Sequence, residues 1–238
     1  MTTNSSSITH AIFDMDGLLI DTESVYTDCY NKFCAQFGKQ FTWEIKQKQM
    51  GRPPNESAKI IIDHLDLPIT VEQHHEMINT MLLKEFPYSK IMPGVNRLLE
   101  HLWQHRVPMC IATGSDQTGF DVKVGGRPEL LSKFHHWVLA GSDPAVGHGK
   151  PAPDCFLVAA DRFDPTPIDP ARVLVFEDAP NGVEAALAAG MKVVWCPDPR
   201  ADISVHAGNP SVTVLRSLED FQPETFGLPP FPTGDPSE

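Results

Sequence analysis

The sequence lacks both a long apolar run and an excess of positive charge. No stretch approaches the roughly 20 apolar residues that a membrane-spanning helix needs. The 238 residues include 31 Asp and Glu but only 19 Lys and Arg, which gives a formal net charge of −12. This charge disfavours binding to nucleic acid or to an anionic membrane through a broad basic surface. The first ten residues contain no apolar segment, so we also expect no signal peptide.

The cysteine pattern of a disulfide-linked protein is missing as well. The number of cysteines is odd, and no Cys-x-x-Cys pair occurs. We therefore expect reduced cysteines that are mostly packed in the interior of a cytoplasmic protein. They are Cys29, Cys34, Cys110, Cys155 and Cys196.

Three motifs of nucleotide and ester chemistry are also absent. The sequence contains neither Gly-x-Ser-x-Gly nor Gly-x-Gly-x-x-Gly. Lys150 follows a glycine, but no Ser or Thr comes after it and the glycine spacing is wrong for a P-loop. The pattern therefore excludes a serine-hydrolase elbow, a dinucleotide fingerprint and a P-loop.

The chain is long enough for one α/β domain with an insertion, or for two small domains. Apolar spacing predicts a first strand over residues 10–14, followed by helical patterns from Thr22 to about Ser89. No good strand occurs in that helical stretch. We therefore expect a helical cap over residues 21–89, inserted into a core made of residues 1–20 and 90–238.

Beyond residue 93, patterns typical of strands and helices alternate. The expected strands are 107–113, 137–140, 173–176, 192–195 and 212–215, and the expected helices are 95–105, 128–134, 154–162 and 181–189. This alternation predicts an α/β fold with a doubly wound parallel sheet, a Rossmann-like core. The proline-rich residues 229–238 are expected to form a disordered tail.

Two carboxylates, Asp14 and Asp16, follow the first predicted strand. Side chains in a strand repeat with a period of two, so both can lean toward the same side. Gly17 lets the backbone turn sharply beyond the strand tip, where open α/β sheets hold their ligands. An Asp pair in a surface loop is the alternative for this motif alone. In a site, a shared proton or a divalent cation would relieve the repulsion between the two acids.

Two further predicted strands end in groups that suit phosphate and metal. Thr113 and Gly114 end one of them, where a hydroxyl and free backbone N–H groups can hold phosphoryl oxygens. Glu177 and Asp178 end the other, and carboxylate oxygens suit Mg²⁺. Each pair has a plain alternative: a β-to-α turn with a Ser cap for the first, and a helix N-terminal cap for the second.

Lys150 lies in a loop bounded by glycine and proline, just before a predicted helix. Such a stiff loop can aim an ammonium group at a phosphate, whereas a lysine in an ordinary loop is usually solvated.

Taken together and in this order, the motifs resemble those of the haloacid dehalogenase-like hydrolase superfamily. The run from Asp14 to Glu23 is similar to the first motif of that family, and Thr113 lies at the hydroxyl position of the second. Residues 149–154 match the third motif, Gly-Lys-Pro-x-Pro-Asp. The resemblance covers the chain outside its termini, with departures at 117–126 and 164–170.

The resemblance implies a phosphomonoesterase that works through an aspartyl-phosphate. Asp14 would be the nucleophile and Asp16 the general acid and base. The phosphoryl group would be bound by Thr113, the Gly114 N–H and Lys150. The presence of Asp16 disfavours a dehalogenase, because a leaving alkoxide needs a proton and a leaving halide does not.

The same resemblance implies Mg²⁺ as the cofactor. Its ligands would be Asp14, the backbone carbonyl of Asp16, and Asp178, with Glu177 nearby or bound through water. Arg52, beside a glycine in the helical insertion, is the candidate for contact between the cap and the substrate. An ordinary loop arginine is the alternative.

Residues 176–186, together with 220–223 and 226–229, resemble one branch of the family, the pseudouridine-5′-phosphatases. This implies pseudouridine 5′-phosphate as the substrate, with small-molecule phosphate esters as partners. We also expect a monomer. A sugar-phosphate phosphatase, or a phosphomutase of the β-phosphoglucomutase type, has the same motifs and cap and remains an alternative. An inactive phosphate-binding scaffold is a more remote one.

Histidine pairs also occur at spacings that bear on metal binding. His101 and His105 lie four residues apart on a predicted helix, which is a spacing that metal sites use. The Glu of a His-Glu-x-x-His motif is missing. We therefore expect surface histidines here, and likewise at 74–75 and 135–136.

Overall fold

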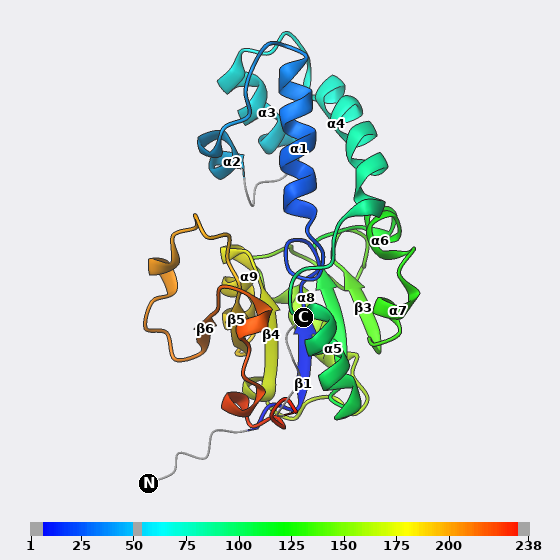
Figure 1. The fold of residues 1–238 in the computed structure, drawn as a ribbon, viewed down its shortest axis with the longest axis vertical. Helices are drawn as coiled ribbons and strands as arrows, with labels where there is room; N and C mark the ends of the chain where they lie inside the picture. Colours follow the sequence, from blue (N-terminus) through cyan, green and yellow to red (C-terminus); the bar gives the residue numbers. More distant parts are fainter. Residues whose placement is uncertain (1–6, 50–53, 233–238) are drawn as a thin grey trace. The chain divides into compact units, whose positions relative to one another are not determined.

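The structure, a computed structural model, describes residues 7–49 and 54–232. Met1–Ile20 and Ile91–Glu238 form one compact unit, and Asp21–Lys90 forms a second. All strands of the described residues belong to the first unit, and every regular element described in the second is a helix (Figure 1). The helical insertion therefore begins after Ile20 and ends at Lys90.

Six parallel strands form one sheet, in the order β3-β2-β1-β4-β5-β6. They are β1 (His10–Phe13), β2 (Met109–Thr113), β3 (His136–Leu139), β4 (Val173–Glu177), β5 (Lys192–Trp195) and β6 (Val212–Val214). Every residue of β1, β2 and β4 is buried. Helices cover both faces of the sheet, which is why these strands are nearly continuous apolar runs. The predicted doubly wound parallel sheet is confirmed.

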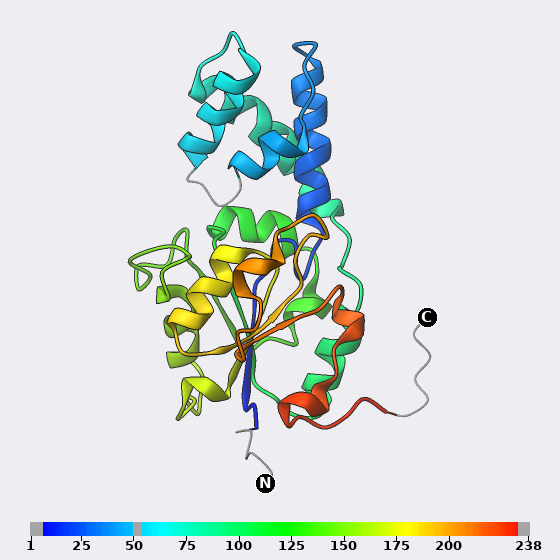
Figure 2. The ribbon, with the colours of Figure 1, turned by 90° about the vertical axis from the view of Figure 1, so that its left-hand side faces the viewer.

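Successive residues of β1 enter two separate hydrophobic cores. Phe13 lies in one core, which includes residues of α5 (Val95–Gln104), α6 (Gln117–Val124) and α7 (Pro128–Leu131). Ile12 lies in the other, which includes residues of α8 (Asp154–Asp161) and α9 (Pro180–Ala188). Figure 2 shows α9 and α5 on opposite sides of the sheet. The Phe13 ring also stacks on Phe176 of β4, with 4.5 Å between centroids, so β1 is held firmly beside β4.

The strand order reverses at β1. The chain passes from β1 to β2 and β3 on one side, and then through β4, β5 and β6 on the other. Open α/β sheets bind ligands at such a reversal, just outside the carboxyl ends of the strands. Asp14 follows β1 there, Thr113 ends β2 and Glu177 ends β4.

The second unit contains α1 (Thr22–Ala35), α2 (Trp43–Gln49), α3 (Pro54–Leu65) and α4 (Val71–Glu85), followed by a 3₁₀ turn, Phe86–Tyr88. Asp21 caps α1 by accepting a hydrogen bond from the Ser24 N–H. Thr70 and Gln73 form a reciprocal capping box at the start of α4. Among the described residues, no helix combines the length and the apolar content needed to cross a bilayer.

The structure corrects two local predictions. His74 and His101 were expected on the surface but are 1% and 4% exposed, so the surface prediction is wrong for both. Helix α6 lies in the stretch 117–126, for which the sequence predicts no element.

Part of the expected disordered tail makes defined contacts. The His101 ring nitrogen Nε2 lies 2.8 Å from the carbonyl oxygen of Pro229, and the Phe231 ring packs against the same imidazole. Residues 229–232 are thereby joined to α5, and residues 233–238 lie outside the described part of the chain.

Candidate active site

A compact turn after β1 presents both predicted catalytic acids. The Asp14 N–H donates to the Phe176 carbonyl at 2.9 Å, which extends the β1–β4 pairing by one residue. Gly17 then adopts a positive φ of 78°, and its N–H donates to the Ile20 carbonyl. Asp14 is 6% exposed, whereas the Asp16 side chain is 24% exposed. The two acids therefore occupy different environments.

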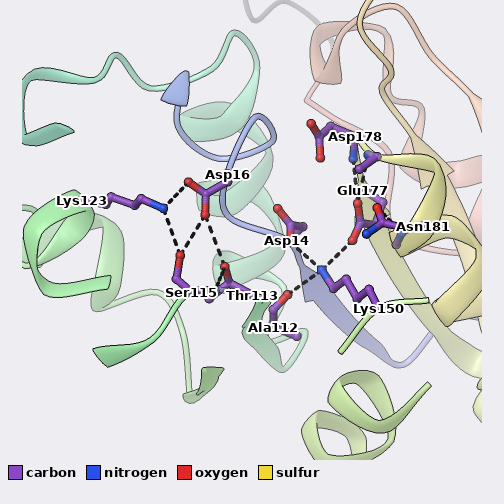
Figure 3. Close-up of polar contacts among 12 residues, drawn as sticks. Asp14, Asp16, Ala112, Thr113, Ser115, Lys123, Lys150, Glu177, Asp178 and Asn181 are labelled. Atoms are coloured by element: carbon purple, nitrogen blue, oxygen red, sulfur yellow. Dashed lines mark hydrogen bonds and ion pairs between the residues drawn. The ribbon is translucent and has the colours of Figure 1, made fainter. Parts of the chain in front are cut away.

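Lys150 joins Asp14 to Glu177. Its ammonium nitrogen lies 2.6 Å from Asp14 Oδ1, 2.7 Å from Glu177 Oε1 and 3.1 Å from the Ala112 carbonyl oxygen (Figure 3). An ammonium group has three hydrogens, and three protein oxygens accept them here. The predicted phosphate-binding lysine is thus held against the predicted nucleophile.

Burial and the neighbouring charges shift the pKa of both Asp14 and Lys150. Burial raises the pKa of Asp14 to about 7, with Lys150 opposing the rise and the carboxylates of Glu177 and Asp16 adding to it. Burial alone would lower the pKa of Lys150, but Asp14 and Glu177 outweigh it and raise that pKa above its ordinary value. The lysine therefore stays charged, while the Asp14 carboxyl ionises only near neutral pH.

Glu177 is fixed by the protein on both of its oxygens. Oε1 faces Lys150, and Oε2 accepts hydrogen bonds from the backbone N–H groups of Asp178 at 3.1 Å and Ala179 at 3.2 Å. The side chain is 1% exposed. The resemblance places Glu177 near the metal. The structure adds a contact between Glu177 and Lys150 that the sequence does not predict.

Three carboxylates converge at the tips of β1 and β4. One oxygen from each of Asp14, Glu177 and Asp178 lies within 4.8 Å of the others. Hard oxygen ligands of this kind suit Mg²⁺, and the concentration of negative charge suits a divalent cation. The donor set therefore fits the magnesium that the sequence predicts. The carboxylate of Asp16 is not part of this set.

Asp16 is held instead by a second lysine. Lys123 Nζ lies 2.7 Å from Asp16 Oδ1 and 3.0 Å from Ser115 Oγ, and Ser115 Oγ lies 3.1 Å from Asp16 Oδ2. Thr113 Oγ1, on the predicted phosphate-binding residue, lies at 3.5 Å from the same carboxylate oxygen. Figure 3 shows this group beside, and separate from, the contacts of Asp14.

Lys123 and Ser115 are not among the site residues that the sequence predicts. A signal for Lys123 does exist, because Phe120, Lys123 and Val124 recur at the i, i+3, i+4 spacing of one helix face. A lysine on the buried stripe of a helix is unusual unless it is paired. All three residues are buried in α6.

The remaining predicted residues are placed as follows. Gly114 is exposed after β2, and a Cβ built there would meet no atom within 4 Å. Asp178 directly follows β4 and is half-buried. Arg52 lies outside the described residues.

Comparison with known proteins identifies the family. Residues 8–190 match the haloacid dehalogenase-like hydrolase family. The Arabidopsis thaliana protein "(DL)-glycerol-3-phosphatase 2" is 47% identical over 233 residues, covering 97% of this chain and 96% of that protein. A Drosophila melanogaster protein named "Probable pseudouridine-5'-phosphatase" is 45% identical over 226 residues, covering 94% of this chain and 96% of that protein.

A solved structure of similar fold is a HAD family hydrolase from Deinococcus radiodurans R1, with bound phosphate and sodium. Its TM-score is 0.77 at 22% identity, covering 94% of this chain and 99% of that chain. The family match is consistent with the strand order and with the acids at the strand tips. The chain belongs to the haloacid dehalogenase-like hydrolase family.

Proposed function

We propose that this phosphoric monoester hydrolase cleaves small alkyl phosphates with Asp14 as the nucleophile and Mg²⁺ as the cofactor. One observation carries the proposal. Asp14 is buried at the tip of the central strand, 2.6 Å from the ammonium group of Lys150 and within a group of three converging carboxylates. A nucleophile so placed has a neutralising cation beside it and two further carboxylates that could share a metal with it.

In the first step, Asp14 attacks phosphorus in line with the leaving oxygen. The bond between phosphorus and that oxygen breaks, and an aspartyl-phosphate forms. Asp16 gives its proton to the departing oxygen, which leaves as a neutral alcohol. In the second step, Asp16 takes a proton from water and the water oxygen attacks phosphorus. The bond between phosphorus and the Asp14 oxygen breaks, and inorganic phosphate leaves. Both aspartates return to their starting state.

Three groups would stabilise the charge that spreads over the equatorial oxygens of the phosphoryl group. They are the Lys150 ammonium, the Thr113 hydroxyl and the Gly114 N–H. The open space beside Gly114 supports this role, because no side chain fills the place next to its backbone.

Asp14, Asp178 and the backbone carbonyl of Asp16 are the groups that would hold Mg²⁺, with Glu177 beside them. When bound, the ion supplies positive charge between the nucleophile and the phosphate.

Residues 21–90 would act as the cap that excludes water and contacts the leaving group. Arg52 is the proposed contact residue there. We propose pseudouridine 5′-phosphate as the substrate, supported by the likeness to the Drosophila melanogaster relative. Glycerol 3-phosphate is the second candidate, supported by the Arabidopsis thaliana relative of similar identity.

The test is phosphate release with Mg²⁺ from a panel of esters that includes both candidates, uridine 5′-phosphate and hexose phosphates. Wild-type protein should favour pseudouridine 5′-phosphate by kcat/KM, and Asp14→Asn should be inactive although folded. Acid-quenched wild-type protein should carry one phosphoryl group on the peptide that contains Asp14. Turnover by a pure Asp14→Asn preparation would contradict the mechanism, and preference for another ester would contradict the substrate.

A further inference from the structure

Lys123 is a buried charged residue, and none of the steps proposed above assigns it a role. Its side chain is 6% exposed. Burying an ammonium group is costly unless oxygen atoms replace the water that it loses. Asp16 and Ser115 supply two such oxygens here.

The position of Lys123 is set by the core rather than by Asp16. On the same helix face, Phe120 and Val124 are 2% and 0% exposed and belong to the hydrophobic core that contains Phe13. Asp116 caps this helix by accepting from the Gly119 N–H at 2.7 Å. Helix α6 is therefore held by its core residues and its N-cap, independently of Asp16, and this fixes the position of the Lys123 ammonium group.

Asp16, in contrast, sits on a turn and is the more exposed of the two acids. A carboxylate on a single methylene can take several rotamers. Lys123 engages one oxygen at 2.7 Å and Ser115 the other at 3.1 Å, while Lys123 also reaches Ser115 at 3.0 Å. This closed triangle, visible in Figure 3, selects one direction for the Asp16 carboxylate.

We propose that Lys123, together with Ser115, is a positioning residue for Asp16 and sets the direction in which this acid meets the leaving oxygen. The inference rests on the proposed function, in which Asp16 is the general acid. Each catalytic aspartate then has its own lysine: Lys150 for Asp14 and Lys123 for Asp16. The two lysines approach the acids from opposite sides (Figure 3).

If Lys123 had only a structural role, its replacement would affect stability and not the acid step in particular. Replacing a buried ion pair by an apolar side chain of similar length often leaves stability unchanged or improved, provided both charges go. Removing Lys123 alone takes the cation from Asp16, whose side chain is 24% exposed and whose Oδ1 is buried, so some stability should be lost. The anchoring of α6 by Phe120 and Val124 is untouched. A positioning role is therefore distinguished by a loss of activity that is selective for the acid step, which a loss of stability alone would not produce.

The experiment compares Lys123→Met with wild type on an alkyl ester, glycerol 3-phosphate, and an aryl ester, p-nitrophenyl phosphate. The quantity is kcat/KM, which reports the steps up to release of the alcohol. An alkoxide needs a proton to leave and a nitrophenolate does not. Misdirecting the acid should cost about 10²-fold on glycerol 3-phosphate. The loss on p-nitrophenyl phosphate should be several-fold smaller.

A double-mutant cycle separates positioning from direct substrate contact. Asp16→Ala alone should lose about 10²–10⁴-fold on the alkyl ester. If Lys123 acts only through Asp16, then Lys123→Met in the Asp16→Ala background should cost nothing more. Lys133→Met is the control, because Lys133 pairs with Glu100 on the same unit and touches none of the three residues of the triangle. It should behave as wild type on both esters.

Equal losses on both esters, additive losses in the cycle, or unchanged or higher activity of Lys123→Met on glycerol 3-phosphate would each overturn the proposal. If Lys123→Met does not fold, Ser115→Ala makes the same test, since it removes the second donor without removing a charge. Its loss must again be selective for the alkyl ester. Asp14→Asn, measured in parallel, distinguishes the two failures: if it remains active, the proposed function itself is wrong.

Discussion

Gly182 lies so close to the carboxylate of Glu177 that any side chain at position 182 would have to displace it. A Cβ built at position 182 would lie 1.8 Å from Glu177 Oε1 and 2.0 Å from its Cδ. Gly182 belongs to the first turn of α9, and both residues are buried. Since Glu177 holds Lys150, and Lys150 holds Asp14, the absence of a side chain at 182 supports the geometry of the whole acid–lysine group.

We expect Gly182→Ala to lower both stability and activity. In most helices, alanine is favoured over glycine by up to about 1 kcal/mol. Here the methyl group must displace a buried carboxylate, and overpacking of this kind costs about 1–3 kcal/mol. Displacing Glu177 also removes one acceptor of Lys150, so kcat should fall at least tenfold, as expected for misplaced catalytic groups. Chemical denaturation and phosphate release would measure the two effects.

Gly126→Ala is the matched control, because a Cβ there would meet no atom within 4 Å. It should leave kcat unchanged. A Gly182→Ala protein with wild-type stability and turnover would show that Glu177 can move without consequence.

Magnesium binding should become weaker as the pH falls below about 7. Burial raises the pKa of Asp14 to about 7, so below that pH the carboxyl keeps its proton and the metal must displace it. The apparent dissociation constant for Mg²⁺ should rise by up to about tenfold per pH unit below 7 and level off above it. Thermal unfolding of the protein at several Mg²⁺ concentrations, at pH 6 and pH 8, would measure this change. Asp14→Asn should remove most of the pH dependence.

Much of the fold could be predicted because the strands carry strong local signals. The runs around Ile12, Cys110 and Val175 are almost entirely apolar, as is typical of strands buried on both faces. Parallel strands also align their carboxyl ends, so residues that follow separate apolar runs fall at one edge. This is why Asp14, Thr113 and Glu177 could be grouped from the sequence.

The direction of each side chain could not be predicted in the same way. Lys150 contacts Asp14 across 136 residues of sequence, and the Lys123–Asp16 contact likewise depends on the completed sheet. Helix α6 is only eight residues long and contains Gly119, which weakens its helical signal. The lysine that it carries therefore remained in a stretch without an assigned element.

The spacing along α4 does contain a signal for the burial of His74. His74, Ile78 and Leu82 recur at i, i+4 and i+8, and all three are buried. Only the partners that cover His74 depend on the completed fold: they are the aromatic rings of Tyr30 and Phe33 on α1, at centroid distances of 5.8 Å and 5.1 Å. Among the described residues, neither ring nitrogen of His74 has a hydrogen-bond partner.

We expect this buried imidazole to make the protein sensitive to mild acid. Burial, helped by His75, lowers the pKa of His74 to about 4 from an ordinary value of 6.5. Between those two values the unfolded chain binds a proton that the folded chain does not, so stability falls as the pH drops from 6.5 toward 4. The size of the effect is about 2 kcal/mol at pH 5. Well above pH 6.5 the residue is neutral in both states and contributes no pH dependence.

His74→Phe should abolish most of this acid sensitivity and raise stability at neutral pH. Phenylalanine keeps a flat ring against Tyr30 and Phe33 and removes two buried polar atoms that lack partners, each of which costs about 1–3 kcal/mol. Urea unfolding followed by circular dichroism at pH 7.5, 6.0 and 5.0 would measure the difference. His75→Phe is the comparison, because His75 is half-buried and its Nε2 lies 2.9 Å from the side-chain oxygen of Asn55. It should keep most of the acid sensitivity, since burial is the larger cause of the lowered pKa of His74 and His75 the smaller one. If His74→Phe and wild type lose stability in parallel between pH 6.5 and 4, another group causes the loss, and His74 must be hydrated in solution.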